Sequence, residues 1–334
     1  MRKTILLALC LCGLWGTSKA QQDPMFTKYM FNSLVFNPAY AGSHEYLSAR
    51  IIYRDQWLGI DGAPTTQSLT VHTPTGERVG VGLSIYNDQI GASGSTTVNF
   101  AYAYRVAFGR GKLSIGIQAG VENWRADWSG LKFKDPQQMD AVFSDGINRW
   151  IPNFGAGVFY YAPKFYVGFS VPHLINFDLQ DDADALGLDE WAKLYRHYFL
   201  SAGVILPIAP GLLFKPSILF KSVGFLGEFS SSPNSFTIGA PTEFDIDLSV
   251  LFYEALWVGV SFRSAVEARA FGGLSSFDSA DIWAAYYLRS GLRIGAAYDY
   301  TLSDLRTFTD GSFEILLGYD FNFSNKKINT PRYF

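Results

Sequence analysis

A strict two-residue alternation near the end of the chain constrains its fold more than any other feature. From residue 313 to residue 323 every odd position is apolar, whereas the even positions, apart from Leu316, are polar or glycine. Successive side chains of a β-strand point to opposite faces of the sheet, so this segment has one apolar and one polar face.

The same alternation recurs along most of the chain, at 79–85, 98–106, 113–121, 165–171, 256–263 and 292–299. Many strands of about 9–11 residues with one apolar face are typical of a transmembrane barrel. A soluble sandwich would alternate too, with its apolar side against a core. The connections between the strands favour the barrel.

Short and long connections alternate. Gly, Pro and short polar residues mark tight turns at 73–76, 109–111, 162–163, 209–211, 253–255 and 289–291. Longer links lie at 58–64, 87–95, 126–150, 172–195, 223–235, 264–280 and 302–311. Alternate links of an up-and-down sheet lie at opposite ends, and short periplasmic turns with longer external loops characterise outer-membrane barrels. The pattern predicts an all-β, antiparallel up-and-down barrel of about 14 strands, with both chain ends in the periplasm.

The composition agrees with this interpretation. Aromatic residues form 16% of the chain, which suits the girdles of a barrel at the membrane interfaces. Beyond the N-terminus no apolar run reaches the roughly 18 residues of a transmembrane helix. Many of the 32 glycines fall on the polar face, where larger side chains would crowd a barrel interior.

Residues 1–20 are interpreted as a secretory signal peptide, because Arg2 and Lys3 precede an apolar stretch and Ala20 ends a small-residue cleavage site. Both cysteines, Cys10 and Cys12, lie inside it, so we expect a mature chain without disulfides or thiolate chemistry. A lipidated Cys10 is the less favoured alternative, since the apolar stretch before it is short. The charge of −3 gives no sign of nucleic-acid binding.

The rest of the chain is expected to comprise an aromatic segment (21–44), a barrel (45–323) and a tail (324–334). The aromatic segment has no strand period. Left in the periplasm it would expose an apolar patch, so we expect Phe26, Tyr29, Phe31 and Phe36 to be shielded at the periplasmic mouth or in the lumen. A second unexplained stretch, over 54–66, reads as a tryptophan followed by a turn.

These two stretches resemble the signatures of the PorP/SprF family, membrane proteins of the type IX secretion system. The resemblance is carried by Asp23, Pro24, Phe26, Tyr29, Met30, Phe31, Asn37, Pro38, Tyr40, Gly42, Arg54, Gln56, Trp57, Gly59, Gly62 and Pro64. Further similar stretches lie at 152–157, 164–174, 196–198, 298–305 and 331–334, so the likeness covers essentially the whole mature chain. It departs around 264–280, where the link looks longer than usual.

The resemblance implies a non-enzymatic barrel of the bacterial outer membrane that supports secretion or surface anchoring of a specific cargo protein of the gliding-adhesin type. The implied partners are a secreted cargo with a C-terminal sorting domain and periplasmic or lipoprotein components of the machine. No cofactor is implied. The residues alone leave a porin or small-molecule transporter open, since charged side chains are predicted to face the lumen at Arg50, Arg54, Arg105, Glu122, Arg263, Arg293 and Asp299.

An enzyme is not favoured. His173 and His197 flank one long link and could approach each other, and a structural pair is a better interpretation than catalysis. Metal-ligand spacing with these histidines is not present. The acidic run at 178–190 lacks the spacing of a calcium loop and is interpreted as a solvated loop.

The cargo contact is predicted on the external loops at 126–150, 172–195 and 264–280. Exposed tryptophans with polar neighbours are typical of protein-binding surfaces, and Trp124, Trp128, Trp150 and Trp191 lie in or beside these loops. Ordinary packing of the loops is the alternative.

Overall fold

The computed structural model describes residues 29–128, 146–175, 177–178, 193–194, 196–223, 242–265 and 277–321. The expected signal peptide and tail, together with Asp23, Pro24, Phe26 and Trp191, lie outside them.

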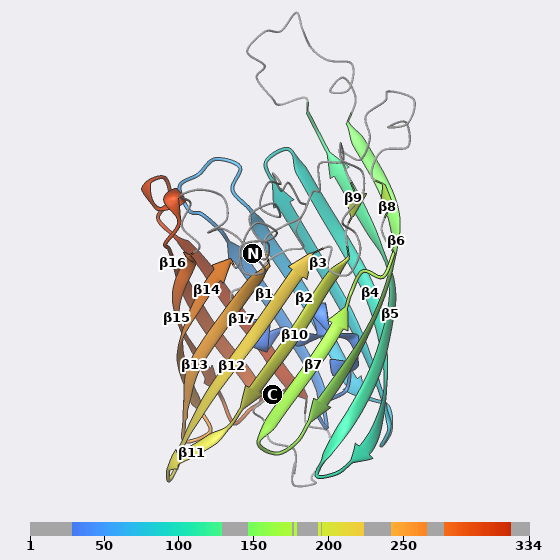
Figure 1. Ribbon diagram of the computed structural model, residues 1–334, viewed down its shortest axis with the longest axis vertical. Helices are drawn as coiled ribbons and strands as arrows, with labels where there is room; N and C mark the ends of the chain where they lie inside the picture. The colour runs from blue at the N-terminus through green and yellow to red at the C-terminus, as the bar shows by residue number, and fades with distance from the viewer. Residues whose placement is uncertain are drawn as a thin grey trace, which may run out of the picture.

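The described chain is almost entirely β-sheet (Figure 1). Its wall strands are β1 (Leu47–Asp55), β2 (Thr65–Pro74), β3 (Val79–Ile90), β4 (Ser93–Phe108), β5 (Gly111–Ala126), β6 (Ile147–Tyr161), β7 (Phe165–Val171), β10 (His197–Val204), β11 (Leu206–Ala209), β12 (Leu212–Val223), β13 (Glu243–Phe252), β14 (Leu256–Ala265), β15 (Phe277–Tyr287), β16 (Leu292–Thr301) and β17 (Ser312–Phe321). A separate hairpin pairs β8 (Phe177–Asp178) with β9 (Lys193–Leu194). The helical elements are η1 (Tyr29–Phe31), α2 (Ser33–Phe36), η2 (Pro38–Tyr40) and η7 (Asp304–Thr307), and none of the helices in the described ranges could span a membrane.

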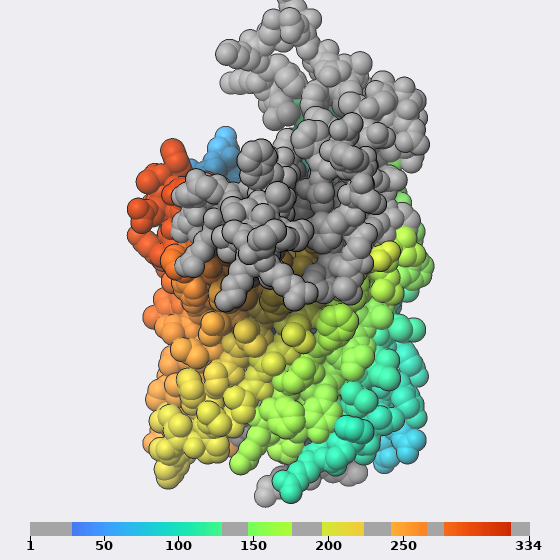
Figure 2. All heavy atoms as spheres, viewed as in Figure 1, coloured from blue at the N-terminus to red at the C-terminus, as the bar shows by residue number. Residues whose placement is uncertain are grey.

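The strands form a closed antiparallel barrel. Consecutive strands pair from β1 to β7 and from β11 to β17, β1 pairs with β17, and β10 pairs with both β7 and β12. Because β11 continues β10 along β12, the wall consists of 14 strands, as the sequence predicts. Figure 2 shows the wall from the side of β7, β10 and β12 as a continuous surface in the parts that are coloured.

The division into short turns and longer links is confirmed at every connection except one. The link expected at 87–95 is a turn of two residues, because β3 and β4 stay paired from Val79↔Tyr104 to Ile90↔Ser93. Polar residues such as Asn87 and Ser95 suggest a loop, yet they continue the ladder beyond its apolar part. Likewise the link expected at 264–280 is shorter, since β14 ends at Ala265 and β15 begins at Phe277.

The two faces of the wall differ as the alternation predicts. Outward residues such as Phe100 and Ile117 are more than 60% exposed, whereas the predicted inward charges Arg50, Arg54 and Arg263 are buried. The other four predicted inward charges, Arg105, Glu122, Arg293 and Asp299, are buried as well. Leu316 interrupts the polar face because it joins a buried apolar cluster inside the barrel.

Proline explains a break in one strand. The β10–β12 ladder stops at Gly203↔Ser217 and the β11–β12 ladder starts at Leu206↔Phe214. Pro216 lies in the gap and has no N–H to donate to a sheet neighbour. Ile205 instead donates its N–H to the carbonyl of Lys164 (2.7 Å).

Candidate functional site

Residues 29–46, here the inner segment, lie inside the wall just before β1 (Figure 1). The Tyr29 hydroxyl donates to Ser217 on β12 (3.2 Å), and Asn32 Nδ2 donates to Ser68 on β2 (3.1 Å). Arg50 on β1 donates to the carbonyl of Phe31. These bonds join the start of the inner segment to opposite sides of the barrel.

The sequence Asn-Pro-Ala-Tyr forms a tight turn against β5 and β6. The Asn37 side chain accepts a hydrogen bond from the Ala39 N–H (3.0 Å), and Pro38 occupies the first helical position of η2. Asn37 Nδ2 also donates to the carbonyl of Val158 (3.2 Å), while Ser114 Oγ donates to the carbonyl of Ala39 (2.7 Å). The motif therefore supplies both its own cap and its attachment to the wall.

Aromatic side chains fill the space around the turn. The Phe31 ring packs edge-on against Trp283 (centroids 5.1 Å apart), and Phe36 packs against Phe199 (5.5 Å). Tyr40 contacts Phe159 edge-on (5.4 Å). Such pairs contribute about 0.5–1.5 kcal/mol beyond the area that they bury. Tyr29, Met30, Phe31 and Tyr40 are each less than 9% exposed.

Glycines of the wall let the inner segment approach the strands closely. A Cβ on Gly116 of β5 would lie 2.5 Å from the carbonyl carbon of Pro38 and still closer to the N and Cα of Ala39. A Cβ on Gly80 of β3 would lie 2.7 Å from the carbonyl carbon of Ala41. Gly42 itself has φ +66°, and its carbonyl accepts a hydrogen bond from Arg105 on β4. The alternation in the sequence places these wall glycines on the inward face but does not show this contact.

Two histidines and two tyrosines surround the end of the inner segment. The Gly42 N–H donates to Nδ1 of His72 (3.2 Å), and Tyr40 Oη lies 3.2 Å from Nε2 of His44. Arg293 donates to Tyr46 Oη (3.0 Å) and pairs with Asp320. Burial raises the pKa of Tyr46 to about 12, so its phenol is neutral at pH 7.

Ion pairs line the wall beyond the inner segment. Arg54 Nη1 lies 2.8 Å from Asp299 and 3.8 Å from Glu314, and Arg263 forms a two-pronged pair with Asp245 (2.7 and 2.8 Å). These charges neutralise one another across adjacent strands, or, for Arg54 and Asp299, across the intervening β17. They therefore stabilise the wall and do not form a ring of one sign.

The structure brings His173 and His197 together, with buried rings in edge-to-face contact 5.8 Å apart. Within the described ranges no group of three or more His, Cys, Asp or Glu side chains is placed to hold a metal ion. The acidic run at 178–190 lies largely outside these ranges.

Hydrogen bonds from the second motif, over 54–66, join the β1–β2 connection to the β3–β4 and β16–β17 connections. Trp57 has φ +54° and donates its N–H to Ser312 Oγ (3.1 Å), while Gly59 and Gly62 have φ of +90° and +76°. Leu58 exchanges backbone hydrogen bonds with Gly311 and Asp310 (2.7 and 2.9 Å) in the link before β17. Gln56 donates to the carbonyl of the buried Pro64 (2.9 Å), and Gly91 donates to that of Gly62 (2.8 Å).

The tryptophans proposed for cargo contact fall into different settings. Trp150 is 71% exposed and belongs to β6, paired with Asn123, so it lies on the wall and not in a loop. Trp124 on β5 and Trp128 just after it are half-buried. The link between these strands spans only 127–146.

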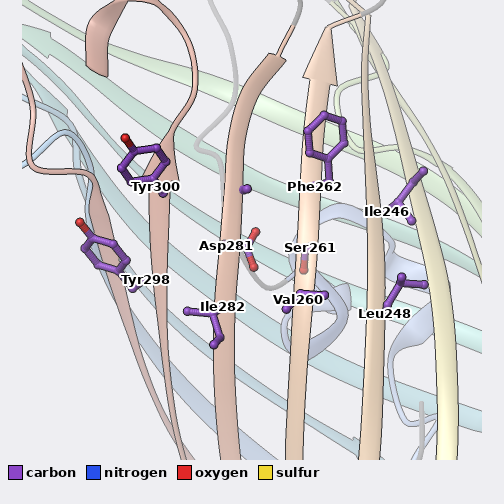
Figure 3. A pocket seen from close by; sticks show the side chains of 10 residues that line it. Ile246, Leu248, Val260, Ser261, Phe262, Asp281, Ile282, Tyr298 and Tyr300 are labelled. Carbon is purple, nitrogen blue, oxygen red and sulfur yellow. The ribbon is translucent and has the colours of Figure 1, made fainter. Parts of the chain in front are cut away.

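A hollow on β13–β16 faces away from the lumen. Ile246, Leu248, Val260, Phe262, Ile282, Tyr298 and Tyr300 surround it (Figure 3), and the exposed members Val260, Ile282 and Tyr300 belong to the outward rows of their strands. The hollow is therefore part of the lipid-facing surface.

One family of known proteins matches most of the chain. The model of a family described as type IX secretion system membrane protein PorP/SprF matches residues 18–319. The chain belongs to the PorP/SprF family. This agrees with the resemblance carried by the two motifs, and together with the closed barrel it assigns the protein to the bacterial outer membrane.

No curated protein matches the chain. Solved structures with a similar barrel include the CymD monoaromatic hydrocarbon channel (TM-score 0.49, 11% identity, 89% of this chain and 94% of that one). A Pseudomonas aeruginosa FadL homologue gives a TM-score of 0.47 at 14% identity over 92% and 96% of the two chains. At these values the likeness carries no argument about what a PorP/SprF protein binds or transports.

Proposed function

We propose that this PorP/SprF protein is a non-enzymatic, plugged barrel that supports the secretion or surface anchoring of a specific cargo protein. Family membership supports a role in type IX secretion. The observation that carries the finer proposal is the inner segment, which bonds or packs to β1–β6, β10, β12, β15 and β16.

A segment attached around so much of the wall obstructs the lumen, and a freely conducting pore needs an open one. Among the described residues, Arg54 and Arg263 face carboxylates on the wall, an arrangement unlike the single-sign ring of charges that a selective channel uses. The partners proposed are the cargo, through its C-terminal sorting domain at the external loops, and periplasmic or lipoprotein components at the short-turn end.

The test compares a deletion strain with the same strain complemented by the wild-type gene. Surface proteins that carry a C-terminal sorting domain are quantified by cell-surface labelling and mass spectrometry. We expect loss of one or a few of them and retention of the rest. An unchanged surface profile, together with a steady open current from the purified protein in planar bilayers, would show that the barrel is a pore.

A further inference from the structure

Aromatic and basic side chains gather on one arc of the short-turn end of the barrel, the lower end in Figure 1. We call this group the aromatic–basic patch. It comprises Tyr104, Phe108, Tyr160 and Phe165 on β4, β6 and β7, with Arg78, Arg110 and Lys164 in the adjoining turns.

Three of the aromatic members contact one another. The Tyr160 ring lies 6.1 Å from that of Phe108 and 5.5 Å from that of Phe165, and its hydroxyl donates to the carbonyl of Phe108 (3.3 Å). Arg78 lies beside Tyr104, with Nη1 3.4 Å from the hydroxyl. The rings of Phe108, Tyr160 and Phe165 thus form a continuous surface, and Tyr104 belongs to the same outward row of β4 as Phe108.

This surface points outward from the wall. Phe108 is 62% exposed, and Phe165 and Tyr104 belong to the outward rows of their strands. Arg78, Arg110 and Lys164 are exposed. A ligand that covered the patch would need an apolar part along the wall and an anionic group beside the turns.

The opposite arc of the same end is different in charge. Leu206 and Ile208 on β11 and Tyr253 in the β13–β14 turn are exposed apolar or aromatic residues. The stretches 205–211 and 253–258 contain no Lys or Arg, and Glu254 adds a negative charge. The third turn of this arc holds one exposed arginine, Arg289, whereas the turns of the patch hold three exposed cations and one acid, Glu77. The concentration of positive charge at the patch is therefore not a general feature of this end.

We propose that the aromatic–basic patch binds the phosphate headgroup of an acidic phospholipid in the leaflet on the short-turn side. Basic groups attract anionic headgroups, Arg donates several hydrogen bonds to a phosphate, and Tyr rings favour the interface between headgroups and acyl chains. An acidic protein would satisfy the charges but would leave the outward rings without an apolar partner, so the lipid is the better fit.

The experiment measures binding of phosphatidylglycerol and of phosphatidylcholine with the same acyl chains to the full mature protein in neutral detergent, by native mass spectrometry. Arg110→Gln and Lys164→Gln are tested singly and together. Arg289→Gln is the matched control, because Arg289 is an exposed arginine in a turn at the same end on the other arc. Retention of the folded band on SDS gels of unheated samples, and its shift on boiling, show that each barrel is intact.

Wild type should retain phosphatidylglycerol in preference to phosphatidylcholine. Each single variant should weaken phosphatidylglycerol binding about fivefold and the double variant about 20-fold, whereas Arg289→Gln should stay within about twofold of wild type. Equal retention of the two lipids by wild type, or an equal loss in the Arg289 control, would overturn the proposal. If the double variant keeps its lipid but loses a co-purifying periplasmic protein, the patch is a protein-docking surface instead.

Discussion

Replacing Gly116 by alanine should release the inner segment from the wall. The added Cβ would lie 2.5 Å or less from three backbone atoms of Pro38 and Ala39, where about 3.5–4.0 Å is needed. Gly318→Ala is the matched control, because that inward glycine of β17 would place its Cβ no closer than 3.5 Å to any neighbour.

The inner segment should yield before the wall does. β5 is paired along its whole length with both β4 and β6. The segment is held here by two hydrogen bonds, from Ser114 to Ala39 and from Asn37 to Val158. Each contributes about 1 kcal/mol, and crowding of a packed site costs about 1–3 kcal/mol. Whether the bonds are lost or the crowding persists, the seated state should become about 1–3 kcal/mol less stable, which lowers the ratio of seated to released segment about 5- to 150-fold.

The assay is alkylation of a single cysteine. The expected mature chain has no cysteine, so Ser43→Cys introduces a unique thiol at a buried position whose hydroxyl makes no hydrogen bond. The Ser43 N–H donates to the carbonyl of Tyr40 (3.0 Å), so its position follows that of the turn. When labelling requires release of the segment, its rate follows the released population. Gly116→Ala should therefore react about 5 to 150 times faster than Gly318→Ala in the Ser43→Cys background.

Equal rates in the two variants, with both barrels folded, would refute the reasoning. They would mean either that the turn accommodates the methyl group in place or that residue 43 is reached without release of the segment. Fast labelling of the Ser43→Cys parent itself would refute the burial of the segment in the membrane-bound protein.

Four further outcomes are expected. Arg54→Met removes the cation beside Asp299 and Glu314 and should lower the free energy of unfolding in urea by about 3–5 kcal/mol. The control Arg125→Met, at an exposed arginine, should lower it by less than about 1 kcal/mol. Equal urea midpoints for the two variants would contradict this prediction. The neutral Tyr46 phenol stabilises the fold below pH ~10, and this contribution should disappear as the pH rises through its pKa of about 12. Tyr46→Phe should therefore reduce the fall in the free energy of unfolding between these two pH values. An unchanged slope of that free energy against pH would contradict the prediction. Exchange of the loops at 126–150, 172–195 and 264–280 with those of a paralogue should change which cargo is displayed at the surface, unless the contact lies in the lumen or at the periplasmic side. Deletion of 331–334 should reduce insertion into the outer membrane, and normal insertion with lost secretion would instead make the tail a partner contact.

The sequence alone was enough to predict the barrel, its strand number and the direction of its side chains. Alternation is a local property, because the chain must turn successive side chains to opposite faces whatever its neighbours are. Phe100 and Ile117 therefore face outward and Arg50 and Arg263 inward as expected. The same reasoning misplaced the 87–95 link, because polar strand residues near a hairpin have the composition of a loop, and only the ladder shows that they are paired.

The tertiary structure alone decided what the inward residues meet. The spacing of the glycines does not predict that Gly116 contacts Ala39 or that Gly80 contacts Ala41. Only closure of the barrel brings these positions together. The pairing of Arg54 with Asp299 likewise spans 245 positions and depends on strands β1, β17 and β16 lying side by side. The residue types of the Asn-Pro-Ala-Tyr motif favour a capped turn by themselves. Its hydrogen bonds to Val158 and Ser114 depend on the closed wall, and local propensity cannot predict them.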